Sequence, residues 1–292
     1  MKRIARSTLA AACAAAVVAV AAAGPAHAAA SSSATFGNLT ITLTDLDPND
    51  GIAPSLIYQA DAQPTIMGET RSFGDEFVQH TFNKVLVGQQ GGLNGALNDE
   101  LASSNASLTS AVTLAGFSSA SASGKALSTV DGNGRYFAEA TGQDPYMNSF
   151  TLSANTMMTI TVNGSARAQT TIGYNLDAFQ AEEANAHLFL DIEAYTDNGT
   201  YVGGYQETTL QALYEVKDDG SVVGQTQSWD GQMSASFSNK TGQSASGFFV
   251  ADVDVSGLSS VAAVPEPETY AMLMAGLALV GWGAKRAKRR QA

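Results

Sequence analysis

Residues 35–44 read TFGNLTITLT, and this stretch indicates the fold class. Leu39, Ile41 and Leu43 alternate with threonines, so one face of the segment is apolar and the other polar. Alternation with a period of two, in a composition rich in β-branched residues, is typical of a half-buried β-strand. The stretch therefore predicts a strand of an antiparallel sheet that has one face in water.

The same alternation returns in four later segments, which are residues 150–152, 158–162, 187–195 and 249–255. Tight hairpins need residues that tolerate positive φ, and three turn sequences supply them: DGNG at 131–134, DNG at 197–199 and DDG at 218–220. The last of these lies between two short strand candidates, residues 213–216 and 221–223. We therefore predict an all-β body, an antiparallel two-sheet β-sandwich of jelly-roll-like form.

Two segments fit this fold less well. Residues 93–101 carry leucines four positions apart and are compatible with a short helix, which Gly95 weakens. Residues 102–128 are dense in Ser, Ala and Gly, and this composition also suits a loosely ordered chain.

The N-terminus has the layout of a cleavable secretory signal. Three basic residues precede the uncharged residues 7–24, and Ala26 and Ala28 then occupy the small-residue positions of a cleavage site. We expect a signal helix within residues 1–28, cut after Ala28. The uncharged run is mostly alanine and falls short of the roughly 20 residues that span a bilayer, which disfavours a permanent anchor.

The rest of the chain divides into a body, residues 29–263, and a tail, residues 264–292. The body has a length typical of one all-β domain. It holds seven Lys and Arg against 25 Asp and Glu, a net charge of −18, and therefore repels nucleic acid and anionic membrane surfaces. The only cysteine, Cys13, lies in the leader, so the mature protein has no disulfides, thiol catalysis or cysteine-based metal site.

The body offers little of the chemistry that catalysis needs. After removal of the leader, only His80 and His187 could serve as a histidine base, both within predicted strands, and no GxSxG motif is present. A glycoside hydrolase would need two carboxylates facing each other across a cleft, and the available neighbours are Glu182 with Glu183 and Asp191 with Glu193. An acidic solvated surface explains these residues equally well, so we expect no catalytic residue.

One loop has the oxygen ligands that calcium prefers. Asp45, Asp47, Asn49 and Asp50 precede Gly51 in DLDPNDG. The spacing departs from an EF-hand loop, and a plain loop after the first strand is the alternative that we favour. Calcium is thus a minor hypothesis, and no other cofactor is expected.

Carbohydrate binding is a second possible role, because aromatic rings can stack on sugars. The residues considered for it are Trp229, Tyr201, Tyr205 and Tyr214. Packing in the core or at a sheet edge is the alternative for each of them.

The C-terminal tail has three parts in a specific order. Val264, Pro265, Glu266 and Pro267 form an extended acidic step, because each proline disfavours helix. The uncharged residues 269–284 follow and predict a single short transmembrane helix, about 24 Å long against a hydrocarbon core of roughly 30 Å. The chain then carries a basic cluster that would hold this end in the cytoplasm, formed by Lys285, Arg286, Lys288, Arg289 and Arg290.

In these parts the tail resembles the PEP-CTERM sorting signal of Gram-negative bacteria. The resemblance implies export, transient retention in the inner membrane and recognition by an exosortase, which then releases the protein or attaches it at the surface. It also implies an association with exopolysaccharide in a matrix or floc. The expected partners are therefore the secretion machinery, an exosortase and exopolysaccharide, and the protein would be a non-enzymatic surface or matrix protein. A carbohydrate-binding module and a secreted glycoside hydrolase are the alternatives.

Overall fold

The structure is a computed structural model, and it describes residues 28–58, 64–86, 91–110, 118–129, 132–141, 150–172, 180–195 and 201–261. These residues belong to one compact unit, Ala28–Val261. The predicted signal helix and C-terminal transmembrane helix lie outside the described residues, apart from Ala28. Within the described ranges, no helix is long and apolar enough to cross a membrane.

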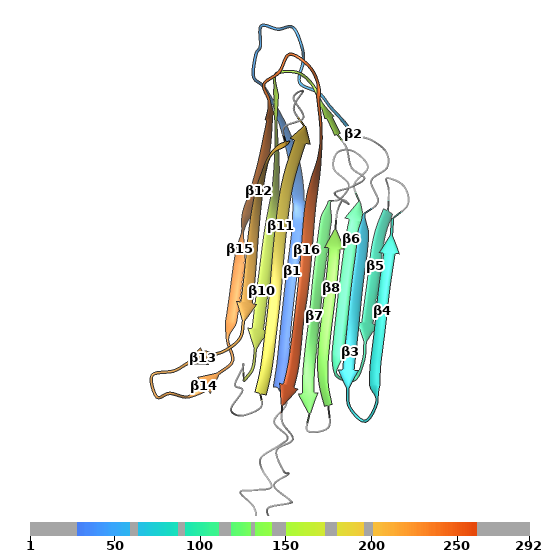
Figure 1. Ribbon diagram of the computed structural model, residues 1–292, viewed down its shortest axis with the longest axis vertical. Helices are drawn as coiled ribbons and strands as arrows, with labels where there is room; N and C mark the ends of the chain where they lie inside the picture. The colour runs from blue at the N-terminus through green and yellow to red at the C-terminus, as the bar shows by residue number, and fades with distance from the viewer. Residues whose placement is uncertain are drawn as a thin grey trace, which may run out of the picture. The chain divides into compact units, whose positions relative to one another are not determined.

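The described part of the chain forms β-strands (Figure 1). In chain order they are β1 (Ala28–Asp45), β2 (Leu56–Tyr58), β3 (Thr65–Phe73), β4 (Phe77–Val85), β5 (Gly91–Asn98), β6 (Ala102–Ser110), β7 (Ser119–Thr129), β8 (Gly132–Thr141), β9 (Phe150–Leu152), β10 (Thr156–Thr170), β11 (Gln180–Tyr195), β12 (Tyr201–Ala212), β13 (Glu215–Val216), β14 (Val222–Val223), β15 (Thr226–Asn239) and β16 (Ala245–Val261). All five segments predicted from period-two alternation lie in strands.

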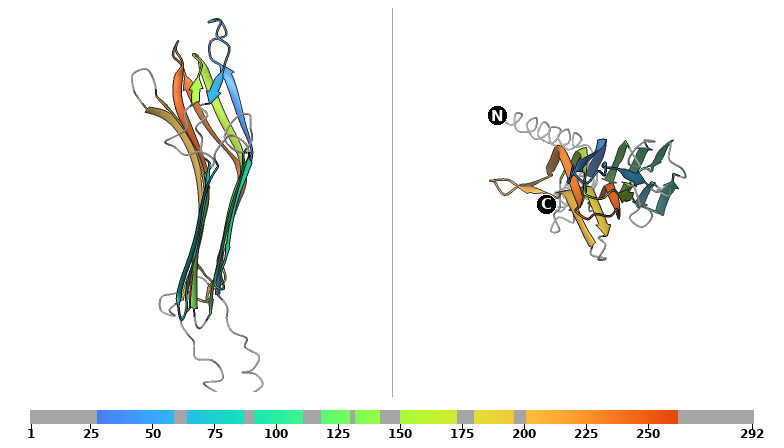
Figure 2. Two further views of the ribbon diagram at one scale, coloured as in Figure 1. Left: turned by 90° about the vertical axis from the view of Figure 1, so that its right-hand side faces the viewer. Right: turned by 90° about the horizontal axis from the view of Figure 1, so that it is seen from above.

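The strands form two facing layers, seen edge-on in the left view of Figure 2. One layer has the order β5-β6-β7-β1-β10-β15, and the other has the order β4-β3-β8-β16-β11-β12, with antiparallel neighbours throughout. The short strands β2 and β9 extend the second layer beside β16. Hydrogen bonds of the β7–β8 hairpin link the two layers at Ser128↔Asn133 and Thr129↔Gly132.

The prediction of an all-β, antiparallel fold is confirmed. Its jelly-roll detail does not match, because a jelly roll has eight strands in two Greek keys. Here fourteen strands are linked, and simple hairpins such as β5-β6-β7 follow one another along a layer.

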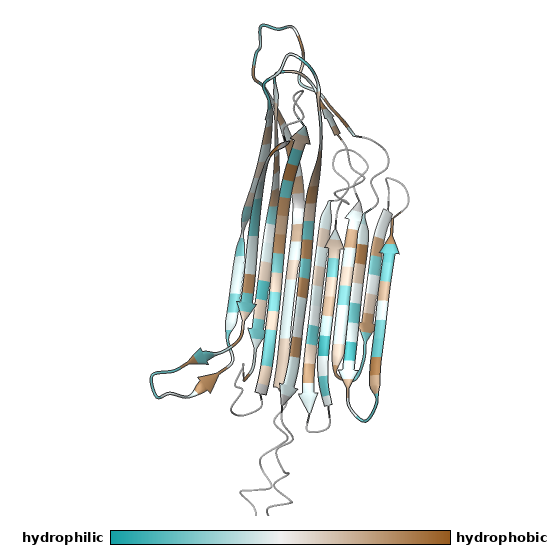
Figure 3. Cartoon of the chain, in the orientation of Figure 1, coloured by the Kyte–Doolittle hydropathy of each residue, from teal (hydrophilic) through white to brown (hydrophobic). Residues whose placement is uncertain are grey.

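The stretch that indicated the fold lies in β1. Leu39, Ile41 and Leu43 pack against the core, while the intervening threonines are exposed. Figure 3 shows the same alternation of hydrophobic and hydrophilic residues along many strands of both layers. The core between the layers is built from such faces, with Leu188, Leu190 and Ile192 of β11 fully buried.

The helix considered for residues 93–101 is wrong, since residues 91–98 form β5 and pair with β6. The segment also alternates with a period of two, and its inward positions are Leu93, Gly95 and Leu97. Gly95 serves packing here, because a Cβ at this position would lie 2.3 Å from Cε2 of the Phe82 ring. Tertiary packing thus overrides the helical spacing of the leucines.

Residues 102–110 and 119–129, within the low-complexity segment, are regular strands. Alanines at alternate positions, among them Ala106, Ala122 and Ala126, are buried between the layers. Small side chains at the inward positions let the two sheets approach closely here, and this gives the segment its order.

The three predicted turns join antiparallel neighbours. At residues 218–220, Gly220 has φ +80°, and the flanking strands β13 and β14 pair as Glu215↔Val223. Asp131 and residues 197–199 lie outside the described residues, but β7 pairs with β8 and β11 pairs with β12 across them. The prediction of a turn at residues 132–134 is wrong, because these residues belong to β8 and Gly132 already pairs with Thr129 of β7.

Candidate functional site

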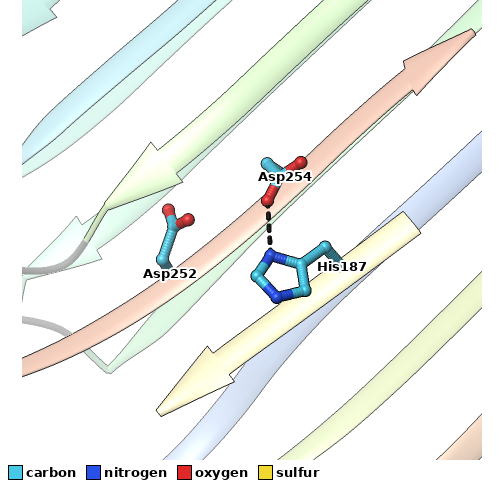
Figure 4. Close-up of side chains that lie close together, drawn as sticks. All are labelled: His187, Asp252 and Asp254. Carbon is cyan, nitrogen blue, oxygen red and sulfur yellow. Dashed lines mark hydrogen bonds and ion pairs between the residues drawn. The ribbon is translucent and has the colours of Figure 1, made fainter. Parts of the chain in front are cut away.

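A histidine and two aspartates lie side by side on the outer face of the second layer (Figure 4). His187 is on β11 and is directly opposite Asp254 of β16, while Asp252 is opposite Phe189. Successive side chains of a strand point to opposite faces. Because Leu188 and Val253 point into the core, these three polar side chains point outward.

The three side chains are close enough to act together. His187 Nδ1 lies 2.7 Å from Asp254 Oδ2, and these atoms form a hydrogen bond. One ligand atom from each of His187, Asp252 and Asp254 lies within 4.8 Å of the other two. The site is half-buried, with side-chain exposures of 28% for His187 and 29% for Asp254.

A fourth acidic group, Glu139 of β8, extends the site on its other side. It is directly opposite Asp254 in the register. The Thr141 hydroxyl lies 2.7 Å from Glu139 Oε1 and 2.9 Å from Asp252 Oδ1, so it bridges the two acids. We refer to His187, Asp252, Asp254 and Glu139 as the outer-face cluster.

The electrostatics of the outer-face cluster favour protonation. Burial raises the pKa of Asp252 to about 7, and the neighbouring Glu139 and Asp254 add to the effect. The pKa of Glu139 is also raised, mainly by burial. The hydrogen bond to Asp254 raises the pKa of His187, with further contributions from the charges of Asp254, Asp252 and Glu207. The cluster can therefore hold protons or bind a cation.

Aromatic rings continue along the same face. The His187 and Phe189 rings are stacked with their centroids 6.1 Å apart. The centroids of the Phe189 ring and of the Tyr205 ring, on β12, are 6.3 Å apart. Tyr205 is 69% exposed. Beyond His187 in the other direction, a groove of about 370 Å³ includes Asn185 and Phe137 in its lining. The cluster thus lies between a polar groove and an exposed tyrosine.

The other predicted stacking residues differ from Tyr205. Trp229 is partly buried and packs against the core, so it is structural. Tyr214 is 41% exposed and precedes β13. The side chain of Tyr201 lies outside the described residues. Of the three candidates whose side chains the structure describes, Tyr205 is the one that combines high exposure with a ring neighbour.

His80 of β4 makes a separate contact with Asp99, the residue that follows β5. Its Nδ1 lies 2.6 Å from Asp99 Oδ1, and Thr70 donates a hydrogen bond to the other oxygen of that carboxylate. This arrangement ties β3 and β4 to the end of β5. A cavity of about 440 Å³ beside it is lined in part by Asp75, Glu76, Asp99 and Glu100.

The two carboxylate pairs considered for glycoside hydrolysis do not face each other across a cleft. Glu182 is fully buried and accepts hydrogen bonds from the backbone N–H groups of Thr171 and Ile172, at 2.7 Å each. Glu183 points to the opposite face. Asp191 and Glu193 share one face of β11 and are hydrogen-bonded to each other, which places them in direct contact.

The calcium candidates form a loop that is stabilised by its own side chains. Asp45, Asp47 and Asp50 each accept a hydrogen bond from the backbone N–H two residues later. Asp50 also accepts one from Asn155 Nδ2 at 2.7 Å, and Gly51 has φ +73°. These contacts match the plain loop after the first strand.

The predicted sorting residues, Val264, Pro265, Glu266 and Pro267, and the basic cluster from Lys285 to Arg290 lie outside the described residues, as does Ala26. Residues 263–290 match the family model described as the PEP-CTERM protein-sorting motif. The tail is a PEP-CTERM motif. It contains the four residues from Val264 to Pro267 and the whole basic cluster. The PEP-CTERM motif supports an exported protein that is sorted by an exosortase.

No curated protein matches the chain. Two solved structures of infectious bursal disease virus, one of its Gx strain and one of its T13 viral particle, were compared with the chain. The Gx strain structure is 10% identical to this chain, and the match covers 86% of this chain and 88% of the viral chain with a TM-score of 0.10. The T13 particle structure is also 10% identical, and the match covers 83% of this chain and 79% of the viral chain with a TM-score of 0.09. Similarity this low supports no structural or functional conclusion.

Ala28, the predicted last residue of the signal peptide, is the first residue of β1 and is buried. Cleavage after Ala28 would leave the strand intact from Ala29, whose N–H donates to Thr171 Oγ1.

Proposed function

We propose that the protein is a non-enzymatic component of the cell surface or extracellular matrix and is associated with exopolysaccharide. The observation that carries this proposal is the PEP-CTERM motif at residues 263–290. In the proposal, the tail holds the protein in the inner membrane for a short time, and an exosortase then releases it or attaches it at the surface. A body of net charge −18 is suited to a hydrated matrix, because its self-repulsion favours solubility.

Processing at the tail is the first prediction. In the native host, mass spectrometry of the mature protein is expected to find a C-terminus upstream of Ala292. Replacing Pro265, Glu266 and Pro267 together with alanine is expected to leave the full-length chain in the membrane fraction, because the extended step for the exosortase is lost. Glu268→Ala, a matched change just outside the step, should be processed normally. A wild-type chain that still ends at Ala292 would make the tail a permanent anchor and contradict the proposal.

A carbohydrate-binding module is the second candidate, and the exposed Tyr205 beside Phe189 favours it. Stacking of an aromatic ring on a sugar needs an accessible ring face, and the polar groove on the far side of the outer-face cluster offers hydrogen-bonding groups on the same face.

Retention on exopolysaccharide tests this candidate. The wild-type protein is expected to be retained on exopolysaccharide purified from the host, and Tyr205→Ala is expected to lose most of that retention. Tyr214→Ala is the matched control, because Tyr214 is exposed and follows the end of β12, where Ala212 pairs with Ala184, five residues from Phe189. Equal retention of both variants would rule out Tyr205 as a sugar-stacking residue, while the sorting proposal would stand.

A further inference from the structure

We propose that the outer-face cluster binds one divalent transition-metal ion, with His187, Asp252 and Asp254 as its protein ligands. The fold brings these residues together from positions 67 apart in the sequence, through the register of β11 and β16. Their ligand atoms already lie within 4.8 Å of one another. A bound ion therefore needs only side-chain adjustments and no rearrangement of the backbone.

The ion would take the place of the proton that His187 Nδ1 shares with Asp254 Oδ2. Nitrogen and oxygen bind Zn²⁺ at about 2.0–2.2 Å, so a tetrahedral ion holds two ligands a little more than 3 Å apart. The present separation of 2.7 Å would widen by less than about 1 Å, which rotation of the half-exposed side chains can supply. With three protein ligands, water would complete the coordination.

The charge balance of the site supports a cation. Asp252 and Asp254 of β16 lie beside Glu139 of β8; Thr141 bridges Glu139 and Asp252, and His187 is hydrogen-bonded to Asp254. Among the residues that the structure describes, no lysine or arginine forms an ion pair with any of these three carboxylates. Half-buried carboxylates that repel one another are costly, and a divalent ion would remove that repulsion.

The ligand set selects the class of metal. Imidazole nitrogen with carboxylate oxygens suits Zn²⁺ and similar transition metals, whereas Ca²⁺ and Mg²⁺ prefer oxygen ligands alone. The site also differs from the Asp45–Asp50 loop, where the carboxylates accept hydrogen bonds from their own backbone. The hydrogen bond from Thr141 to Asp252 Oδ1 would fix the orientation of the Asp252 carboxylate toward the ion.

The test is calorimetric titration of the purified full chain, made without a polyhistidine tag and freed of metal with EDTA. With ZnCl₂ we expect one ion per chain. At a hundredfold excess over Kd, the melting temperature should rise by about 5–10 °C. CaCl₂ at the same concentration should give no comparable heat.

Three variants locate the site. His187→Gln and the double variant Asp252→Asn/Asp254→Asn are each expected to lose the one-to-one uptake of Zn²⁺. The double variant Asp218→Asn/Asp219→Asn removes two acidic residues from an exposed turn and should bind Zn²⁺ like the wild type. If His187→Gln fails to fold, the Asp252→Asn/Asp254→Asn variant decides. Absence of Zn²⁺ uptake by the wild type, unchanged affinity in the ligand variants, or a preference for Ca²⁺ would each overturn the proposal.

Discussion

Replacing Gly124 with alanine is expected to lower the free energy of unfolding by about 3 kcal/mol. Tyr136 of β8 crosses from one layer to the other, and its hydroxyl forms a hydrogen bond of 2.6 Å with Ser32 Oγ. A Cβ at Gly124 would lie 2.0 Å from Cδ2 of the buried Tyr136 ring. The ring must therefore move, which disturbs the packing between the layers and breaks the hydrogen bond. Urea denaturation at constant m-value measures the change.

A control substitution and a double-mutant cycle show whether the Tyr136 ring causes the loss of stability in Gly124→Ala. Gly242→Ala is the matched control, since a Cβ there would meet no atom within 4 Å, and its effect should stay within about 0.5 kcal/mol. In a Tyr136→Ala background, Gly124→Ala should lose most of its cost, because the ring that it displaces is absent. Equal costs in both backgrounds would contradict this account of the packing.

The metal-free protein is expected to become less stable as the pH rises from about 4 to 8. In the folded state the pKa of Asp252 is raised from 3.8 to about 7 by burial beside Glu139 and Asp254. The folded chain therefore keeps a proton that the unfolded chain releases near pH 4, and stability falls as pH rises between these values. The raised pKa of His187 acts in the same direction, since its contribution is full below about pH 6.5 and is lost above its folded pKa.

Substitution of Asp252 by asparagine isolates its share of this effect. Between pH 4 and pH 8, the free energy of unfolding should fall by about 2–3 kcal/mol more for the wild type than for Asp252→Asn, after allowance for the partial solvent exposure of the site. Asp230→Asn, on β15 and exposed, should follow the wild type at every pH. Chemical denaturation in EDTA at several pH values measures both. Parallel curves for the wild type and Asp252→Asn would show that Asp252 ionises as freely in the fold as outside it.

Alternation in the sequence was sufficient to predict the fold class, and β1 shows why. Leu39, Ile41 and Leu43 are large and β-prone, so their period is visible without any knowledge of their partners. In β6 and β7 most inward positions hold small residues, including Ala106 and Ala122, which carry too little hydrophobic contrast with serine to give a clear signal. Their order depends on the facing layer, which a sequence pattern does not contain.

The outer-face cluster could be predicted only in part. His187 lies in the predicted strand 187–195, and the aspartates Asp252 and Asp254 lie in the predicted strand 249–255. Their meeting depends on which strands pair and in what register, and a slip of one residue would turn every side chain to the opposite face. No local feature fixes the pairing of β11 with β16. The PEP-CTERM motif, by contrast, is a contiguous signal and was predictable from the sequence alone.

The final strand of the body has a mechanical consequence. β16 pairs with β11 along Gln180↔Val261 to Tyr195↔Ser246 and with β8 on its other side, so it is held on both edges. If the protein is attached at the surface through its C-terminus, a pulling force enters the body at Val261 and runs along this strand. Such a load shears many hydrogen bonds at once, where an edge strand would peel away one bond at a time. The body is therefore joined to its tail through a strand that is paired on both edges, and this pairing resists such a pull.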